Sequence, residues 1–169
     1  MKDKSLGAYN IGDLREIARR RLPKGVFEFI DRGTEDEVSL RHNRAVFERI
    51  KFRPRTLVDV SARSQQITLL GQQQKMPIAV APTGSAGLTW HEGEIALARA
   101  AAAAGIPFTL ATGSMTAMEK VADQAGGRLW FQLYMWPDRS LSHKLVERAK
   151  AAGFEGLVIT VDSPVPPSR

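Results

Sequence analysis

From Pro77 onward, short apolar segments alternate with longer segments of helical character, and this alternation is the strongest constraint on the fold. Apolar runs of four or five residues between such segments are typical of buried strands. Each crossover helix returns the chain to the same end of a sheet, so the pattern predicts parallel strands. The predicted strands are residues 78–81, 108–111, 129–133 and 157–161, and the predicted helices are residues 92–104, 117–124 and 139–152.

Four parallel strands are compatible with an open doubly wound sheet or with part of a closed (β/α)8 barrel. A nucleotide-binding open sheet ordinarily carries a glycine-rich phosphate loop after its first strand. The segment after the first predicted strand is Pro82-Thr83-Gly84-Ser85-Ala86-Gly87, which matches neither GxGxxG nor GxxxxGK[ST]. The sequence therefore favours the barrel over the open sheet.

The N-terminal third of the chain predicts short helices. The pair Leu22-Pro23 ends the first helix, because proline cannot continue a helix. The predicted helices span residues 11–21, 25–31 and 35–50. In the third helix the predicted inward side chains are Val38, Val46, Phe47 and Ile50.

A strand at residues 67–71 enters a turn and pairs with residues 72–75 as a small hairpin. We therefore expect two parts in an α/β chain. Residues 1–76 form a helical segment whose hairpin caps the barrel, and residues 77–169 form the first four βα units.

The formal net charge of +6 attracts anions such as phosphate or carboxylate groups. A basic domain is also the electrostatic footprint of nucleic-acid binding. The arginines are scattered, however, and are not interleaved with aromatic residues as a base-stacking groove requires. We therefore expect a solvated basic surface and no nucleic-acid partner.

The chain of 169 residues contains no cysteine, which excludes a disulfide framework, a thiol nucleophile and a cysteine-ligated metal. It has no apolar run of the ~20 residues that a membrane span needs. The first four residues lead into no apolar signal core. We expect a cytoplasmic protein, with peripheral membrane association left open.

Polar or small residues stand at the carboxyl ends of the predicted strands, where parallel α/β proteins bind their ligands. Gly84 lets the backbone approach a flat ligand, while Gln132 offers an amide and Thr160 a hydroxyl. Structural alternatives stay open, because Gln132 and Thr160 can satisfy loop backbone groups. Tyr134 can be a core aromatic, and Asp162 can form an Asx turn.

The three histidines stand in helical or loop contexts without metal-ligand spacing such as HExxH. They are His42, His91 and His143. We therefore expect no metal site and assign these side chains structural or surface roles.

Many separate motifs, in order and with compatible spacing, resemble the FMN-dependent 2-hydroxy-acid dehydrogenases and oxidases. This family includes glycolate oxidase, mandelate dehydrogenase and L-lactate oxidase. The resemblance covers residues 10–169. The motifs are Arg21-Leu22-Pro23-Lys24, Gly33-Thr34-Glu35-Asp36-Glu37, Asn43-Arg44 with Phe47, Phe52-Arg53-Pro54-Arg55, Val58-Asp59-Val60-Ser61, Met76-Pro77-Ile78, Ala81-Pro82-Thr83-Gly84, Trp130-Phe131-Gln132-Leu133-Tyr134 and Thr160-Val161-Asp162.

The resemblance implies the first four strands of a (β/α)8 TIM barrel preceded by short helices, with FMN at the carboxyl-end mouth. The implied reaction oxidises a 2-hydroxy acid to a 2-oxo acid and reduces FMN. Such a reaction needs a base of near-neutral pKa, which suits histidine, and a carboxylate that stabilises the imidazolium. FMN accepts the reducing equivalents, and the protein orients and tunes it.

The resemblance also implies residue roles. Pro82, Thr83 and Gly84 match the segment that lies against the flavin ring, and Ala111 stands near it. Gln132 and Thr160 match positions that hydrogen-bond the isoalloxazine edge.

On the substrate side, Tyr134 matches a tyrosine that contacts the substrate near its hydroxyl, and Asp162 an aspartate that pairs with the catalytic histidine. Arg169 aligns with a loop arginine that approaches the substrate. Phe29 stands where many members have a tyrosine that binds the substrate carboxylate. A phenyl ring makes no such hydrogen bond, which indicates a more apolar acid.

Other departures concern the flavin side. Ala111 replaces a frequent serine, and Gly113 replaces a bulky aromatic, which indicates room for a larger substrate side chain. Gly84 replaces an alanine of several oxidases and weakly favours a dehydrogenase or monooxygenase.

In the family, the base histidine, the main carboxylate-binding arginine, a flavin-contacting lysine and the phosphate site all follow later in the chain. We therefore expect a C-terminal half of the same enzyme, as a second chain or a cleaved remainder, to close the barrel. Complete units are expected to form homotetramers. Two alternatives stay open: a catalytically silent flavin-binding or scaffold module, and a truncated chain without independent function.

Overall fold

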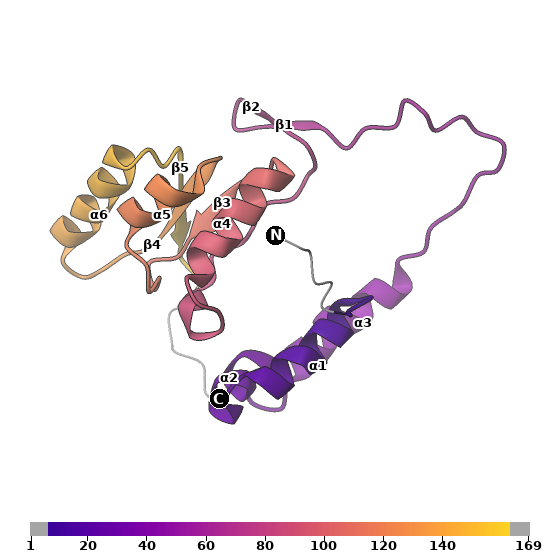
Figure 1. Cartoon of the computed structure of the whole chain (residues 1–169), viewed down its shortest axis with the longest axis horizontal. Coiled ribbons are helices and arrows are strands. Elements are labelled where there is room, and N and C mark those ends of the chain that lie inside the picture. Colours follow the sequence, from indigo (N-terminus) through magenta and orange to yellow (C-terminus); the bar gives the residue numbers. More distant parts are fainter. Residues whose placement is uncertain (1–6, 163–169) are drawn as a thin grey trace. The chain divides into compact units, whose positions relative to one another are not determined.

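The computed structural model describes residues 7–162, and the contacts among them divide the chain into two units (Figure 1). Residues 7–57 form the first unit and residues 58–162 form the second. The first unit is helical, whereas the second contains all the strands. Each unit is described by itself.

The first unit consists of three short helices: α1 (Ile11–Arg21), α2 (Lys24–Asp31) and α3 (Val38–Arg49). Asn10 caps α1, because its side-chain oxygen accepts the backbone N–H of Asp13 at 3.0 Å. Two hydrogen bonds of 2.5 and 2.7 Å join Arg15 of α1 to Asp31 of α2. The hydrogen bond from Arg15 is the main reason that the pKa of Asp31 is lowered.

The predicted bounds of α1 are confirmed, and α2 begins one residue earlier than predicted. The third helix begins at Val38 and not at Glu35, because Glu35 and Glu37 have positive φ angles of 49° and 57° that no helix contains.

The inward orientation predicted for α3 is wrong for this unit. Val38, Phe47 and Ile50 are exposed to 65%, 69% and 65%, and Val46 is half-buried. Three short helices are too few to cover the apolar side of α3.

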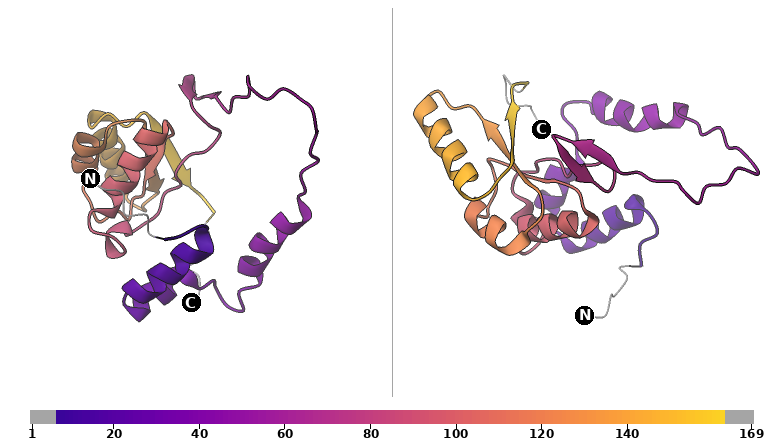
Figure 2. Two further views of the ribbon diagram at one scale, coloured as in Figure 1. Left: turned by 45° about the vertical axis from the view of Figure 1, so that its right-hand side comes forward. Right: turned by 90° about the horizontal axis from the view of Figure 1, so that it is seen from above.

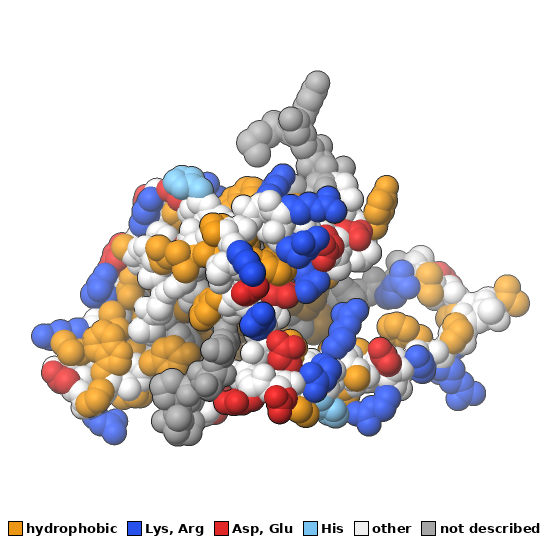
Figure 3. All heavy atoms as spheres, turned by 90° about the horizontal axis from the view of Figure 1, so that it is seen from below, with side chains coloured by type: hydrophobic (Ala, Val, Ile, Leu, Met, Phe, Trp, Pro, Cys, Tyr) orange, Lys and Arg blue, Asp and Glu red, His pale blue; other side chains and the backbone are white. Residues whose placement is uncertain are grey.

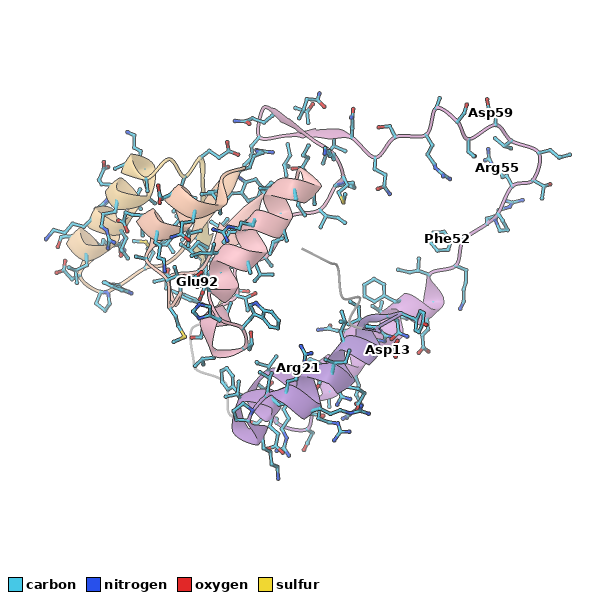
Figure 4. The ribbon with its side chains drawn as sticks, in the orientation of Figure 1. Asp13, Arg21, Phe52, Arg55, Asp59 and Glu92 are labelled. Carbon is cyan, nitrogen blue, oxygen red and sulfur yellow. The ribbon has the colours of Figure 1, made fainter. Side chains whose placement is uncertain are left out.

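Residues 50–66 follow α3, span the boundary between the two units and contain no helix or strand. Figure 4 labels Phe52, Arg55 and Asp59 along this extended segment. Asp59 accepts hydrogen bonds from the backbone N–H and the hydroxyl of Ser61, which lower its pKa. These two bonds form a local Asx turn, and they are the main side-chain hydrogen bonds within the segment.

The second unit opens with the predicted hairpin. Strands β1 (Ile67–Leu69) and β2 (Gln72–Gln74) pair antiparallel. The turn residues Leu70 and Gly71 have φ angles of 50° and 76°, which is the conformation that matches the twist of a two-residue hairpin. The hairpin prediction is confirmed.

Three parallel strands form the sheet of the second unit in the order β3 (Phe108–Leu110), β4 (Leu129–Tyr134) and β5 (Gly156–Thr160). All three were predicted. The strand expected at residues 78–81 is reduced to a single bridge, in which Val80 pairs parallel with Phe108. Pro77 and Pro82 flank the segment and have no N–H to donate, and the N–H of Ile78 turns back to Met76.

Helices α4 (Gly93–Ala104), α5 (Met118–Ala125) and α6 (Arg139–Ala151) lie as one layer beside the strands (Figures 1 and 2). Their apolar side chains pack against alternate strand residues on one face of the sheet. The core includes Ile95, Val121, Ala149, Phe108, Leu110, Leu129, Phe131 and Leu133.

The strand order follows the chain without a reversal, and the described crossover helices cover a single face. An open doubly wound sheet has helices on both faces and a reversal of strand order. The described strands and helices therefore have the singly wound arrangement that barrels use, which is the alternative that the sequence favoured.

None of the described helices combines the length and the apolar character that crossing a membrane requires. On the face shown in Figure 3, Lys and Arg side chains are interspersed with acidic and hydrophobic ones.

Candidate active site

The carboxyl ends of β3, β4 and β5 are joined by one chain of side-chain hydrogen bonds. Gln132 on β4 is 2% exposed. Its Oε1 accepts the backbone N–H of Thr112 at 3.0 Å, and its Nε2 donates to the hydroxyl of Thr160 at 2.8 Å. The sequence predicted Gln132 and Thr160 at this end of the sheet, and the structure joins them by a hydrogen bond.

Thr112 follows β3 and belongs to the same network; its position after a predicted strand placed it at this end of the sheet, but no individual role was predicted for it. Its hydroxyl donates to the backbone carbonyl of Gln132 at 2.6 Å and accepts the backbone N–H of Tyr134 at 3.2 Å. Its place directly after a buried strand was the available signal. The structural alternative for Gln132 is therefore partly correct, since its Oε1 satisfies a loop N–H.

Two loops run side by side at this end. Pro82, Thr83 and Gly84 are exposed after the first-strand bridge. The N–H of Ser85 donates to the carbonyl of Gly113 at 2.9 Å, in the loop that follows β3. The structure therefore places the segment after Val80 beside the loop that begins with the buried Ala111.

Tyr134 ends β4 and is 47% exposed, so it is not a core aromatic in this unit. By the strand register it pairs with Thr160. Asp162 is exposed two residues beyond the end of β5. Both therefore stand at the same end of the sheet as Gln132.

For two predicted residues the described structure gives no position relative to the site. Phe29 is 61% exposed on α2, in the helical unit. Arg169 lies outside the described residues.

Glu94 is a buried carboxylate that sequence reasoning missed. It is 1% exposed in the first turn of α4. Burial raises its pKa, but hydrogen bonds from its own backbone, Met115, Thr116 and Gly87 outweigh burial and leave the pKa lowered. The signal in the sequence was a charged residue on the alanine-rich face that Ile95 and Ala98 continue.

The opposite, amino end of the sheet is closed by the hairpin. Arg128, just before β4, donates to Glu155 at 2.5 Å, to Gln74 at 3.3 Å and to the carbonyl of Leu69 at 3.2 Å. Its guanidinium also lies 5.7 Å from the centroid of the Trp130 ring. These contacts hold the hairpin against the amino end of the sheet.

Within residues 7–162 no group of three His, Cys, Asp or Glu side chains is arranged to hold a metal ion. The carboxyl end offers hydrogen-bond groups instead. The Thr160 hydroxyl serves Gln132 as an acceptor, which leaves its own hydrogen able to donate, and Gln132 Nε2 has a second hydrogen. The fold is that of barrel-type α/β proteins, a class whose ligands bind at the carboxyl ends of the parallel strands.

Comparison with known proteins identifies the family. Residues 18–169 match the FMN-dependent dehydrogenase family, and the chain belongs to it. It is 45% identical over 158 residues to the (S)-mandelate dehydrogenase of Pseudomonas putida, and 49% identical over 163 residues to a putative L-lactate dehydrogenase of Mycobacterium tuberculosis. These matches cover 94% and 96% of this chain.

Solved structures agree. A soluble mutant of the membrane-associated mandelate dehydrogenase superimposes with a TM-score of 0.91 at 45% identity, over 95% of this chain and 46% of that one. A mandelate oxidase mutant with the C4a-OH-FMN adduct gives 0.87 at 42% identity, over 93% and 47%. FMN is therefore the cofactor of this family. The chain spans 40% of the length of the mandelate dehydrogenase and 39% of the length of the putative lactate dehydrogenase.

Proposed function

We propose that this chain carries the flavin-facing part of an enzyme that oxidises a 2-hydroxy acid to a 2-oxo acid and reduces FMN. The observation that carries the proposal is the hydrogen-bonded set Thr112, Gln132 and Thr160 at the carboxyl ends of parallel strands, in a chain of this family. Such a set orients a planar, hydrogen-bonding ring.

The donor groups fit an isoalloxazine edge. We infer that the free hydrogens of Gln132 Nε2 and of the Thr160 hydroxyl bind it, because no other described group uses them. Pro82, Thr83 and Gly84 would lie against the ring face, since a Cβ at Gly84 would meet only the Gly113 carbonyl oxygen, at 3.6 Å. Ala111 would line the same wall from beneath.

The remaining roles follow from position. Tyr134 would donate its phenol hydrogen near the substrate hydroxyl, and Asp162 would hold the imidazolium of a base histidine, whose positive charge a neighbouring carboxylate stabilises. Phe29 and Arg169 would face the substrate, Phe29 with an apolar ring and Arg169 with a guanidinium suited to carboxylate. When bound, FMN supplies the acceptor for the reducing equivalents.

The substrate class we infer is a 2-hydroxy acid with a large apolar side chain. Gly113 adds no side chain to the loop beside Gly84, and Phe29 has no hydroxyl. Some relatives are named for mandelate, an acid with an aromatic side chain, and others for lactate or glycolate, so the choice rests on Gly113 and Phe29.

We further propose that these strands are the first four of a (β/α)8 barrel, with residues 1–76 as a helical segment whose hairpin covers its amino end and residues 77–169 as the first four βα units. Among the described strands, β5 pairs on one side only, and its Leu157 and Ile159 are exposed to 45% and 48% on the face that the helices cover elsewhere. On the other face the buried Trp130 Nε1 has no described acceptor. Further βα units from the C-terminal half of the enzyme would cover Leu157 and Ile159 and would supply an acceptor for Trp130 Nε1.

The test is anaerobic mixing of the complete FMN-loaded enzyme with a panel of 2-hydroxy acids. We expect the visible flavin absorbance to bleach and one equivalent of 2-oxo acid to appear by mass spectrometry, most rapidly with aromatic acids. Bound FMN that no 2-hydroxy acid bleaches would show a catalytically silent flavin-binding module instead.

A further inference from the structure

Glu94 connects two loops of the proposed flavin site through one carboxylate. Its Oε1 accepts the backbone N–H of Gly87 at 3.3 Å and that of Met115 at 3.1 Å. Its Oε2 accepts the hydroxyl of Thr116 at 3.0 Å. Gly87 lies in the short 3₁₀ helix η1 (Ala86–Leu88), within the loop segment that follows the first-strand bridge. Met115 and Thr116 belong to the loop that follows β3.

These are the loops that carry the proposed flavin contacts. The first contains Pro82 to Gly84, and the second begins with Ala111. Apart from the Ser85–Gly113 backbone hydrogen bond, Glu94 provides the hydrogen bonds that fix one loop relative to the other. A shift of the carboxylate therefore moves both loops.

The choice of a carboxylate at this buried position requires an explanation. Among residues 7–162 no Lys, Arg or His side chain forms an ion pair with Glu94, although a buried charge without a partner is costly. Its lowered pKa keeps it ionised at neutral pH, so it acts only as an acceptor. An apolar side chain would fill this space at lower cost, as Ile95 does next to it, but would leave two loop N–H groups without an acceptor.

The same loop contains conformations that need external support. Ser85 and Glu92 both have left-handed backbone angles, with φ of 56° and 51°, which side chains other than glycine rarely adopt. Glu92 is labelled at the start of α4 in Figure 4. Gly93 lies so close to the loop that a Cβ there would stand 2.5 Å from the Ala86 carbonyl oxygen. The loop is thus packed directly on the first turn of α4.

We propose that Glu94 is a positioning residue that holds the loops of residues 82–87 and 111–116 as one wall of the FMN site. The proposal rests on the proposed function. Glu94 contacts neither the flavin nor the substrate, and acts through the loop backbones that it binds.

The test compares Glu94→Ala and Glu94→Gln in the complete enzyme, with Glu119→Ala as the matched control. Glu119 is an exposed carboxylate in the first turn of α5; its side chain pairs with Arg148 and forms no described hydrogen bond to either loop. The rate of amide hydrogen exchange in residues 82–88 and 111–117 measures how firmly the two loops are held. Fluorescence titration with FMN measures the affinity of the site for the cofactor.

In Glu94→Ala we expect faster exchange in both loops together, unchanged exchange in β4, and FMN binding weaker by about tenfold or more. In Glu94→Gln the amide oxygen still accepts from Gly87 and Met115, and the amide nitrogen donates to the Thr116 hydroxyl. This variant should bind FMN within about threefold of the parent. Glu119→Ala should change neither readout.

A second variant tests the same loops without altering the carboxylate. Gly93→Ala pushes the Ala86 carbonyl away from α4, and it should also accelerate exchange in residues 82–88 and weaken FMN binding. The proposal is overturned if Glu94→Ala binds FMN as the parent does, or if exchange rises equally through β4, which would mark a merely structural residue. Failure of the proposed function is a separate result, because a parent enzyme that no 2-hydroxy acid bleaches still gives both the exchange rates and the FMN affinity.

Discussion

Gln132 Nε2 on β4 donates to the hydroxyl of Thr160 on β5 across 2.8 Å, so neighbouring strands are joined through side chains as well as backbone. Thr112 extends the connection to the loop after β3 through the Oε1 of the same amide. One buried amide therefore fixes the relative positions of three strand ends.

Gln132→Met should weaken both folding and flavin binding. The thioether matches the length of glutamine but leaves the Thr112 N–H and the Thr160 hydroxyl without their partner, at a cost of about 2–4 kcal/mol. Urea unfolding and FMN titration measure the two effects. Gln73→Met is the control, because Gln73 is exposed on the hairpin and bonds only Thr68; equal losses in both variants would contradict the prediction.

Thr160→Val should have a smaller and more selective effect. Valine keeps the shape of threonine and removes the hydroxyl, so Gln132 loses one acceptor at about 1–2 kcal/mol. We expect the FMN spectrum to shift, since a proposed donor to the ring is lost. Thr68→Val at an exposed hairpin position is the matched control, and an unshifted spectrum in Thr160→Val would remove Thr160 from the flavin site.

Asp162→Asn should reduce kcat by about 10²–10⁴-fold while FMN affinity stays unchanged. A neutral amide no longer stabilises the imidazolium that forms when the base histidine takes a proton. Stopped-flow flavin reduction gives the rate. The control is Asp123→Asn, at an exposed position of α5, which should leave the rate of flavin reduction unchanged. An unchanged rate in Asp162→Asn would contradict the prediction and show that Asp162 only forms a turn.

The lowered pKa of Glu94 predicts a dependence of stability on pH. A carboxyl group whose folded pKa lies below its ordinary value of 4.5 contributes stability above that value and loses it as pH falls through the folded pKa. The difference in unfolding free energy between the parent and Glu94→Gln should therefore be constant near neutral pH and shrink below about pH 4.5. Urea titrations at several pH values measure it, and a difference that grows on acidification would show the opposite sign.

Ile159→Asp should destabilise the complete enzyme by about 3 kcal/mol or more, because we expect a further helix to cover this face of β5 and to bury the charge. Leu70→Asp is the control: Leu70 is exposed in the hairpin turn at a φ of 50°, which aspartate tolerates. Thermal unfolding compares the two. Equal melting temperatures would mean that β5 is an open edge in the enzyme as well.

Local signals predicted the regular elements well. Leu22-Pro23 ends α1 as predicted, and the apolar runs at Phe108, Leu129 and Leu157 form the three parallel strands of the sheet. The strand expected at residues 78–81 was reduced to the Val80 bridge, since two flanking prolines limit its pairing.

Long-range relationships were harder to predict. Gln132 and Thr160 were expected at one end of the sheet because parallel strands align their carboxyl ends. Glu94 was missed, because its partners Gly87 and Met115 are distant in sequence and use backbone N–H groups that no side-chain motif reveals. The exposed apolar side of α3 shows the same limit, since a helix pattern indicates an apolar face but not what covers it.

The interactions of Arg128 have a practical consequence for recombining relatives. The Arg128 guanidinium donates to Gln74 and to the Leu69 carbonyl in the hairpin and to Glu155 next to β5, so it connects the hairpin to the sheet. A chimera whose crossover point falls between residues 75 and 127 would take the hairpin from one parent and the arginine from the other. Exchanging only the loops at the carboxyl ends of the strands leaves Arg128 and its partners in one parent. Substrate preference can then be varied without disturbing the contact between the hairpin and the sheet.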